Sequence, residues 1–181
     1  MKRFLPLFLS VFMLISCSDD ATSMFSNREY VFCKLPVTSY PELLSVMGNP
    51  GQFASIRKRG TMLTITSNGS STDYDLRTNA IYSTFEFGLG GIIVGTSYLT
   101  DENGRFIDFC YDLACPICDS AGRKLTLSND GYAKCAKCGV VYDLNNYGVI
   151  HKVPENADLT VKRGLYRYRI NYNGQIVNAY N

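Results

Sequence analysis

Two cysteine boxes, CPIC at residues 115–118 and CAKC at residues 135–138, are the strongest structural signal in the 181-residue chain. A C-x2-C spacing lets two sulfurs converge from one tight turn, and Gly139 permits the positive φ that such a turn often needs. Two turns that face each other would surround one point with the sulfurs of Cys115, Cys118, Cys135 and Cys138. Because thiolates favour Zn and Fe, the sequence predicts a tetracysteine metal site.

The stretches around the boxes predict antiparallel β-structure. The clearest hairpin has an alternating strand at residues 165–171, a turn at Asn173-Gly174 and a return strand at residues 175–179. A loop is expected at residues 68–71. Further strands are expected at residues 30–35, 53–58, 62–66, 80–87, 91–99 and 106–110.

One short helix is expected among these strands. Pro41 lies near its start and Gly48 ends it, with Leu43, Leu44 and Met47 on one face. The predicted fold class is therefore all-β, an antiparallel small-sheet or barrel sandwich with one short helix.

The first sixteen residues predict a signal peptide, domain segment 1–16. Lys2 and Arg3 precede 13 apolar residues ending at Ser16, which as a helix would reach ~20 Å, short of the ~30 Å hydrocarbon core. The run ends in Leu14-Ile15-Ser16-Cys17, which resembles a bacterial lipobox. The resemblance implies that Cys17 carries lipid; an ordinary signal peptide with a chance cysteine is the alternative.

The lipobox resemblance also implies a location. Ser18 after the anchor indicates the outer membrane, with the protein lipid-anchored on its periplasmic or cell-surface face. Residues 17–28 would form the lipidated tether and residues 29–181 the β domain, with metal-binding loops within 110–148. Without Lys2 and Arg3, 16 basic residues balance 16 acidic ones. The membrane is thus the expected partner, and nucleic acid is not.

Residues 53–180 resemble a Rieske iron–sulfur domain. The resemblance rests on Cys-Pro in the first box, on Gly-x2-Tyr-Asp-Leu at residues 139–144, and on the flanking hairpins. It implies a Rieske-type sandwich with a rubredoxin- or zinc-ribbon-like metal subdomain. Rieske boxes contain one His each, but Ile117 and Cys138 stand where those residues belong. His151 is the only histidine, so a cluster with two imidazole ligands cannot form.

Three states of the four cysteines follow from the sequence. They could hold one Zn or Fe ion, or an all-Cys [2Fe–2S] cluster with a potential near about −400 mV. In an exported protein they could instead form disulfides and hold no metal. The first state suits a non-catalytic module, and the second an electron carrier with a redox partner protein.

No catalytic residue is predicted. His151 is accompanied by no Gly-x-Ser-x-Gly motif, and 181 residues leave no room for the separate catalytic domain of an oxygenase. A redox-active form would therefore be an electron carrier, and the sequence names no small-molecule substrate. Cys33 and Cys110 lie in apolar strands, where they either form a disulfide or serve as small buried apolar side chains.

Overall fold

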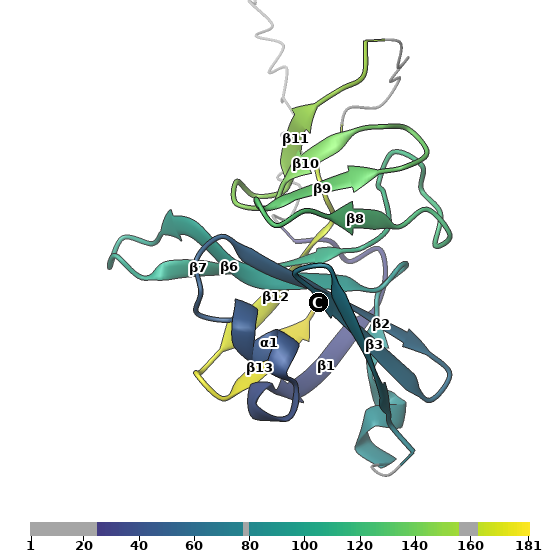
Figure 1. Ribbon diagram of the computed structural model, residues 1–181, viewed down its shortest axis with the longest axis vertical. Coiled ribbons are helices and arrows are strands. Elements are labelled where there is room, and N and C mark those ends of the chain that lie inside the picture. The colour runs from purple at the N-terminus through teal and green to yellow at the C-terminus, as the bar shows by residue number, and fades with distance from the viewer. Residues whose placement is uncertain (1–24, 78–79, 156–162) are drawn as a thin grey trace, which may run out of the picture.

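The computed structural model describes residues 25–77, 80–155 and 163–181. The predicted signal peptide and Cys17 lie outside the described residues. Within these residues, nine strands form a large antiparallel sheet in the order β4-β3-β2-β6-β7-β12-β13-β1-β5 (Figure 1). Their bounds are β1 Val31–Pro36, β2 Gln52–Arg59, β3 Met62–Ser67, β4 Ser70–Asp75, β5 Glu86–Phe87, β6 Ile92–Thr100, β7 Phe106–Asp112, β12 Arg167–Tyr172 and β13 Ile176–Tyr180.

A second, small sheet lies against the large one. It has the order β11-β10-β9-β8 and lies above β6 and β7 in Figure 1. Its strands are β8 Leu125–Leu127, β9 Tyr132–Cys135, β10 Val141–Asp143 and β11 Val149–Lys152. The segment predicted as metal-binding loops therefore contains most of an antiparallel sheet.

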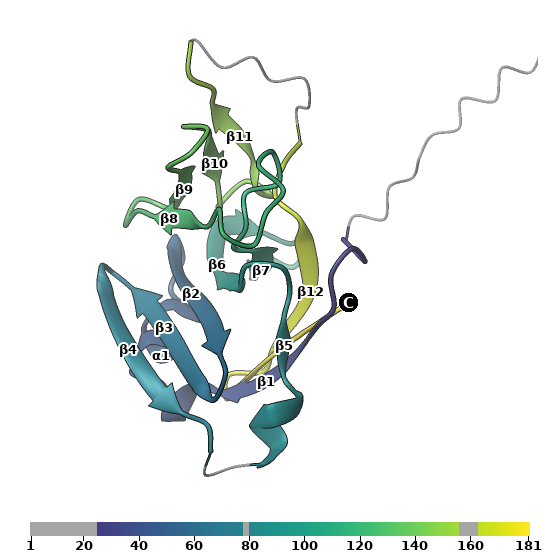
Figure 2. The same cartoon turned by 90° about the vertical axis from the view of Figure 1, so that its right-hand side faces the viewer.

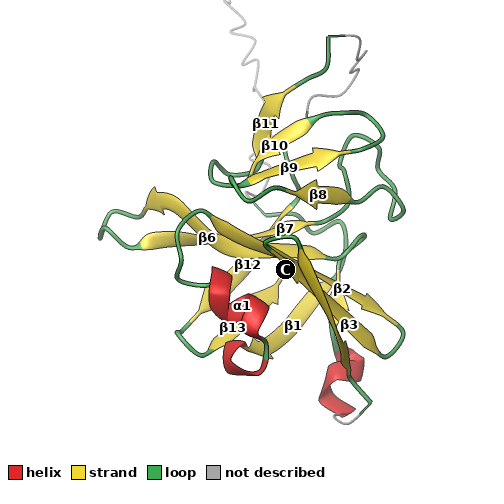
Figure 3. Ribbon diagram, viewed as in Figure 1, coloured by secondary structure: helices red, strands yellow, loops and turns green. Residues whose placement is uncertain are grey.

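The predicted all-β class with a single short α-helix is confirmed for the described residues (Figure 3). The α-helix is α1, Pro41–Val46, and short 3-10 helices lie at Val37–Ser39 and Ala80–Thr84. None of the described helices is long and apolar enough to span a bilayer.

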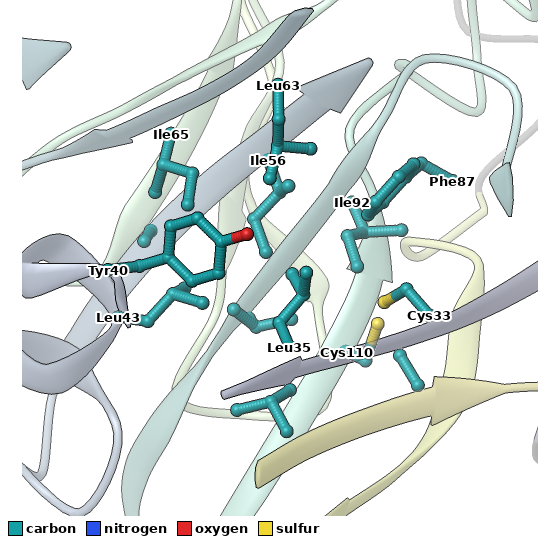
Figure 4. Packing of buried hydrophobic residues seen from close by; sticks show 14 of the residues in the cluster. Cys33, Leu35, Tyr40, Leu43, Ile56, Leu63, Ile65, Phe87, Ile92 and Cys110 are labelled. Atoms are coloured by element: carbon teal, nitrogen blue, oxygen red, sulfur yellow. The ribbon is translucent and has the colours of Figure 1, made fainter. Parts of the chain in front are cut away.

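The large sheet curls around its own apolar core (Figure 2). In the middle of the sheet Ile56 faces Ile65 on β3 and Ile92 on β6, so three strands bring branched side chains together. α1 contacts β2 and β3 and adds Leu43 to this core, as Figure 4 shows. Burial of such side chains, each contributing about 1.5–3 kcal/mol, is the main source of stability here.

The small sheet has a separate apolar cluster beneath it. Phe109 and Tyr111 point out of β7 and meet Tyr142 of β10 and Leu144. The hydroxyl of Tyr111 donates to the carbonyl of Leu144 at 3.0 Å, which ties the two sheets together. The small sheet thus rests on the outer face of the large sheet.

The C-terminal hairpin and the strands at residues 53–58 and 62–66 were predicted correctly, and the two strands pair as β2 and β3. Two neighbouring segments were not. Residues 68–71, expected as a loop, hold only a turn at Asn68-Gly69, and β4 begins at Ser70. β4 is a polar edge strand, and its hydroxyl pair Thr66–Ser71 at 2.7 Å replaces the apolar contacts that the sequence lacks.

Residues 80–87, expected as a strand, form a 3-10 helix followed by the two-residue β5. The turn from Tyr82 to Phe85 places these two rings 5.2 Å apart, so core packing outweighs strand propensity. In α1, the predicted position of Leu44 on the buried face was also wrong. Leu43 and Val46 are buried, whereas Leu44 is 53% exposed, because it lies about 100° away around the helix.

Candidate metal centre

The four predicted cysteines meet at one point. All four Sγ atoms lie within 4.8 Å of one another. Two of these separations cross between the boxes, 3.6 Å for Cys115 and Cys138 and 3.7 Å for Cys118 and Cys135. A tetrahedron with Zn–S bonds of about 2.3 Å has edges of about 3.8 Å. The four cysteines are free thiols in this structure and together could hold a metal ion.

Both boxes form the same local turn. The N–H of Asp119 donates to the carbonyl of Cys115, and the N–H of Gly139 donates to that of Cys135, each at 2.9 Å. The residue after each second cysteine has positive φ, 49° at Asp119 and 74° at Gly139. The predicted role of Gly139 is confirmed, and in the first box an aspartate, which tolerates this conformation better than most residues, takes the same position.

Backbone N–H groups point at the sulfur of Cys135. Burial acts to raise the pKa of Cys135, but hydrogen bonds from the N–H groups of Cys138 and Lys137 outweigh it and leave this pKa lowered. Burial and neighbouring sulfurs raise the pKa values of Cys118 and Cys138. Four thiolates this close repel one another, so a cation is needed before all four ionise.

The site has an inner and an outer pair of sulfurs. Cys115 and Cys135 are buried, at 0% and 1% exposure, whereas Cys118 and Cys138 are half-buried. The hydroxyl of buried Tyr142 lies 3.6 Å from Cys115 Sγ. An ion held here would be shielded on one side by the apolar cluster and would approach the surface on the other.

Asp112 connects the first box to the large sheet. Its carboxylate accepts the N–H groups of Leu89 at 2.7 Å, Gly90 at 3.1 Å and Ala114 at 2.7 Å. It also accepts the hydroxyl of Tyr168 at 2.7 Å. Burial nevertheless raises the pKa of Asp112. Through this carboxylate, Ala114, the residue before Cys115, is linked to Leu89 and Gly90 in the glycine-rich segment before β6.

Sequence reasoning missed Asp112. An acidic residue at the end of β7, next to the buried residues Cys110 and Tyr111, was the available signal, since a buried carboxylate needs several donors. The glycine-rich segment before β6 also approaches the backbone just before the first box closely. A Cβ on Gly90 would lie 2.7 Å from the backbone nitrogen of Ala114, which leaves no room for a side chain there.

The remaining candidate residues lie apart from this cluster. His151, on β11, is exposed, and the centre of its ring lies 4.4 Å from that of Tyr132, with the two rings tilted by 38°. Cys33 and Cys110 are both fully buried in the core of the large sheet, where Figure 4 shows their sulfurs close together. They are free thiols in this structure, and burial raises their pKa values. A disulfide between them stays a prediction.

Comparisons with protein-family models, with curated proteins and with solved structures found no match to this chain.

Proposed function

We propose that Cys115, Cys118, Cys135 and Cys138 bind a single Zn or Fe ion that stabilises the small sheet. The observation that carries the proposal is the separation of the four sulfurs, all within 4.8 Å. In a [2Fe–2S] cluster, two thiolates bind each iron, and thiolates on different irons lie farther apart than those on the same iron. Four mutually close sulfurs therefore favour one ion over a two-iron cluster.

A structural role is supported by the size of the small sheet. Its strands have only three or four residues each. Cys135 ends β9, and its N–H donates to the carbonyl of Val140 just before β10. An ion bound to both boxes would hold this corner closed, so that metal-binding energy becomes folding energy. We propose no catalytic step.

Metal analysis of protein purified without oxygen tests this proposal. We expect one Zn or Fe per chain, loss of that ion in Cys115→Ser, and a lower melting temperature in the presence of a chelator. Cys33→Ala is the matched control, since it removes a buried thiol outside the site and should keep full metal content. A metal-free protein whose melting is unaffected by chelator would refute the proposal.

Electron transfer is the second candidate, and the half-exposed outer pair, Cys118 and Cys138, favours it. An iron at this position would lie within reach of a docked redox partner protein. The N–H groups aimed at Cys135 and the hydroxyl of Tyr142 would stabilise negative charge on the sulfurs. Anaerobic protein should then be coloured, with a charge-transfer band that bleaches on reduction; colourless protein with zinc rules this candidate out.

We further propose that the domain is a Rieske-like module of a lipoprotein at the outer membrane. Paired turns that meet above an antiparallel sheet support the first part, and the lipobox-like residues ending at Cys17 support the second. Mass spectrometry of the mature protein should find lipid on Cys17, and Cys17→Ser should move the protein to the soluble fraction. Unmodified Cys17 in membrane-free protein would contradict the anchor.

A further inference from the structure

Four arginines gather where the N-terminal segment joins the fold. We call them the arginine face: Arg28, Arg163, Arg167 and Arg169. Residues at the end of the predicted tether pack here, since the N–H of Ser26 donates to the carbonyl of Arg167 at 2.7 Å. Figure 2 shows the start of the described chain beside β12, on the side of the molecule opposite β3 and β4.

Aromatic rings, not carboxylates, accompany most of these arginines. The guanidinium carbons of Arg167 and Arg169 lie 4.7 Å and 5.1 Å from the centre of the Phe25 ring. Those of Arg28 and Arg163 lie over the Tyr166 ring, and both side chains donate to its hydroxyl. Such contacts spread the guanidinium groups across the surface without neutralising them.

The face carries net positive charge. Arg28 pairs with Asp119 at 2.6 Å, but Arg163, Arg167 and Arg169 pair with no carboxylate of the described residues. Arg167 is only 8% exposed, and its Nε has no hydrogen-bond partner. Glu29, which follows Arg28 in sequence, is one further acidic residue of this segment. The guanidinium of Arg167 thus packs among aromatic rings, and the positive charge on this side is not balanced by a carboxylate paired with it.

The proposed anchor brings a bilayer to the same place. From Cys17 to Phe25 there are only eight residue steps, which span at most about 28 Å. The arginine face begins where this short segment ends, so it stays near the lipid head groups whenever the anchor is inserted. Tyr147, 44% exposed and stacked 5.1 Å from Arg167, adds an aromatic side chain of the kind that favours the interface.

We propose that the arginine face binds the phosphate groups of anionic lipids in the membrane that holds the anchor. The domain would then lie on the bilayer through β12 and residues 25–28, with the side formed by β2, β3 and β4 turned away from it. Basic residues at such a surface each strengthen binding about fivefold. That the arginine face lies at a membrane rests on the proposed lipid anchor. The test of its lipid binding uses protein without the anchor.

Vesicle binding of a lipid-free protein tests the proposal directly. The mature chain with Cys17→Ala should sediment with vesicles containing phosphatidylglycerol and not with pure phosphatidylcholine, and added salt should release it. Arg163→Gln with Arg169→Gln should weaken binding about 25-fold. The control pair Arg57→Gln with Arg59→Gln removes the same charge from β2 and should leave binding nearly unchanged.

A fluorescent reporter gives a second measurement. The chain contains no tryptophan, so Tyr147→Trp should report on the arginine face and exposed Leu44→Trp on α1, which lies away from this face in Figure 2. Anionic vesicles should shift the emission of the first variant to the blue and leave the second unchanged. Equal binding to both lipids, no binding to either, or equal loss in the two arginine pairs would overturn the proposal. Each variant's metal content is measured in parallel, so failure of the metal site is seen separately.

Discussion

The two sheets of this protein differ in the apolar core and in the cysteines that could stabilise them. The large sheet has strands of up to nine residues and encloses apolar side chains that are almost completely buried. The small sheet has strands of three or four residues and places four cysteines at one corner. We expect hydrophobic burial to suffice for the first sheet and the second to need a bound ion. The cysteines show the same contrast, since Cys33 and Cys110 fill the core but the other four described ones converge on one point.

The largest expected effect is at the proposed metal site and tests whether the small sheet alone depends on the ion. Cys135→Ser removes an inner ligand and should destabilise the protein by more than about 4 kcal/mol, with loss of the ion. Hydrogen exchange should show β8 to β11 unprotected while the large sheet keeps its protection. Cys110→Ala, the counterpart in the large sheet, should cost about 1 kcal/mol and retain the metal. Simultaneous loss of protection in both sheets would show that they form one cooperative unit.

Asp112 provides the next largest effect, because it links the two regions. Asp112→Ala leaves three backbone N–H groups and the Tyr168 hydroxyl without their acceptor, at a cost of about 3 kcal/mol. Urea denaturation measures this loss. Tyr168→Phe removes only one donor and should cost about 1 kcal/mol. Equal losses in the two variants would show that the backbone bonds contribute little.

The raised pKa of Asp112 also predicts a pH dependence. Burial places its folded pKa above the unfolded value, so its contribution to stability is fully present below the unfolded pKa of about 3.9 and is lost as pH rises through the folded pKa. Asp112→Asn should remove this dependence. Parallel stability curves for the two proteins across the acid range would contradict it.

Gly90→Ala tests how tightly the first box rests on the large sheet. The added Cβ would lie 2.7 Å from the nitrogen of Ala114, so the backbone before Cys115 must move, at a cost of about 2 kcal/mol. Metal affinity should fall as well. Gly122→Ala is the control within the same region, because the nearest atom to its Cβ would be 3.8 Å away. Denaturation and metal competition should show a clear loss for the first variant and almost none for the second.

Some features of this fold follow from local sequence patterns, and others depend on contacts between distant residues. The two C-x2-C boxes, Gly139 and the hairpin turns are local patterns, and each predicted the corresponding structure. The role of Asp112 depends on donors from 22 and 56 residues away in the chain, which no local pattern contains. The same applies to β4, whose polar side chains pair with β3, and to the contacts of Arg167 with Phe25. Long-range contacts therefore account for most of what the sequence left open.

The smallest expected effect lies in the large sheet, far from the metal site. Thr72 and Tyr74 of β4 donate to the carboxylate of Glu42 on α1. Burial acts to raise the pKa of Glu42, but these hydrogen bonds outweigh it and leave the pKa lowered. The stability from this group is thus present above the unfolded pKa of about 4.3 and is lost as pH falls through the folded pKa.

Glu42→Gln should cost less than about 1 kcal/mol at neutral pH and have less effect in acid. Because the contact joins α1 to β4 within the large sheet, chelator should lower the melting temperature equally in Glu42→Gln and in the unchanged protein. A chelator effect that differs between the two would mean that the sheets are coupled beyond the bonds of Asp112 and Tyr111. The apolar core and the proposed metal site would then contribute to the stability of one cooperative unit, and the two sheets would not be stabilised separately.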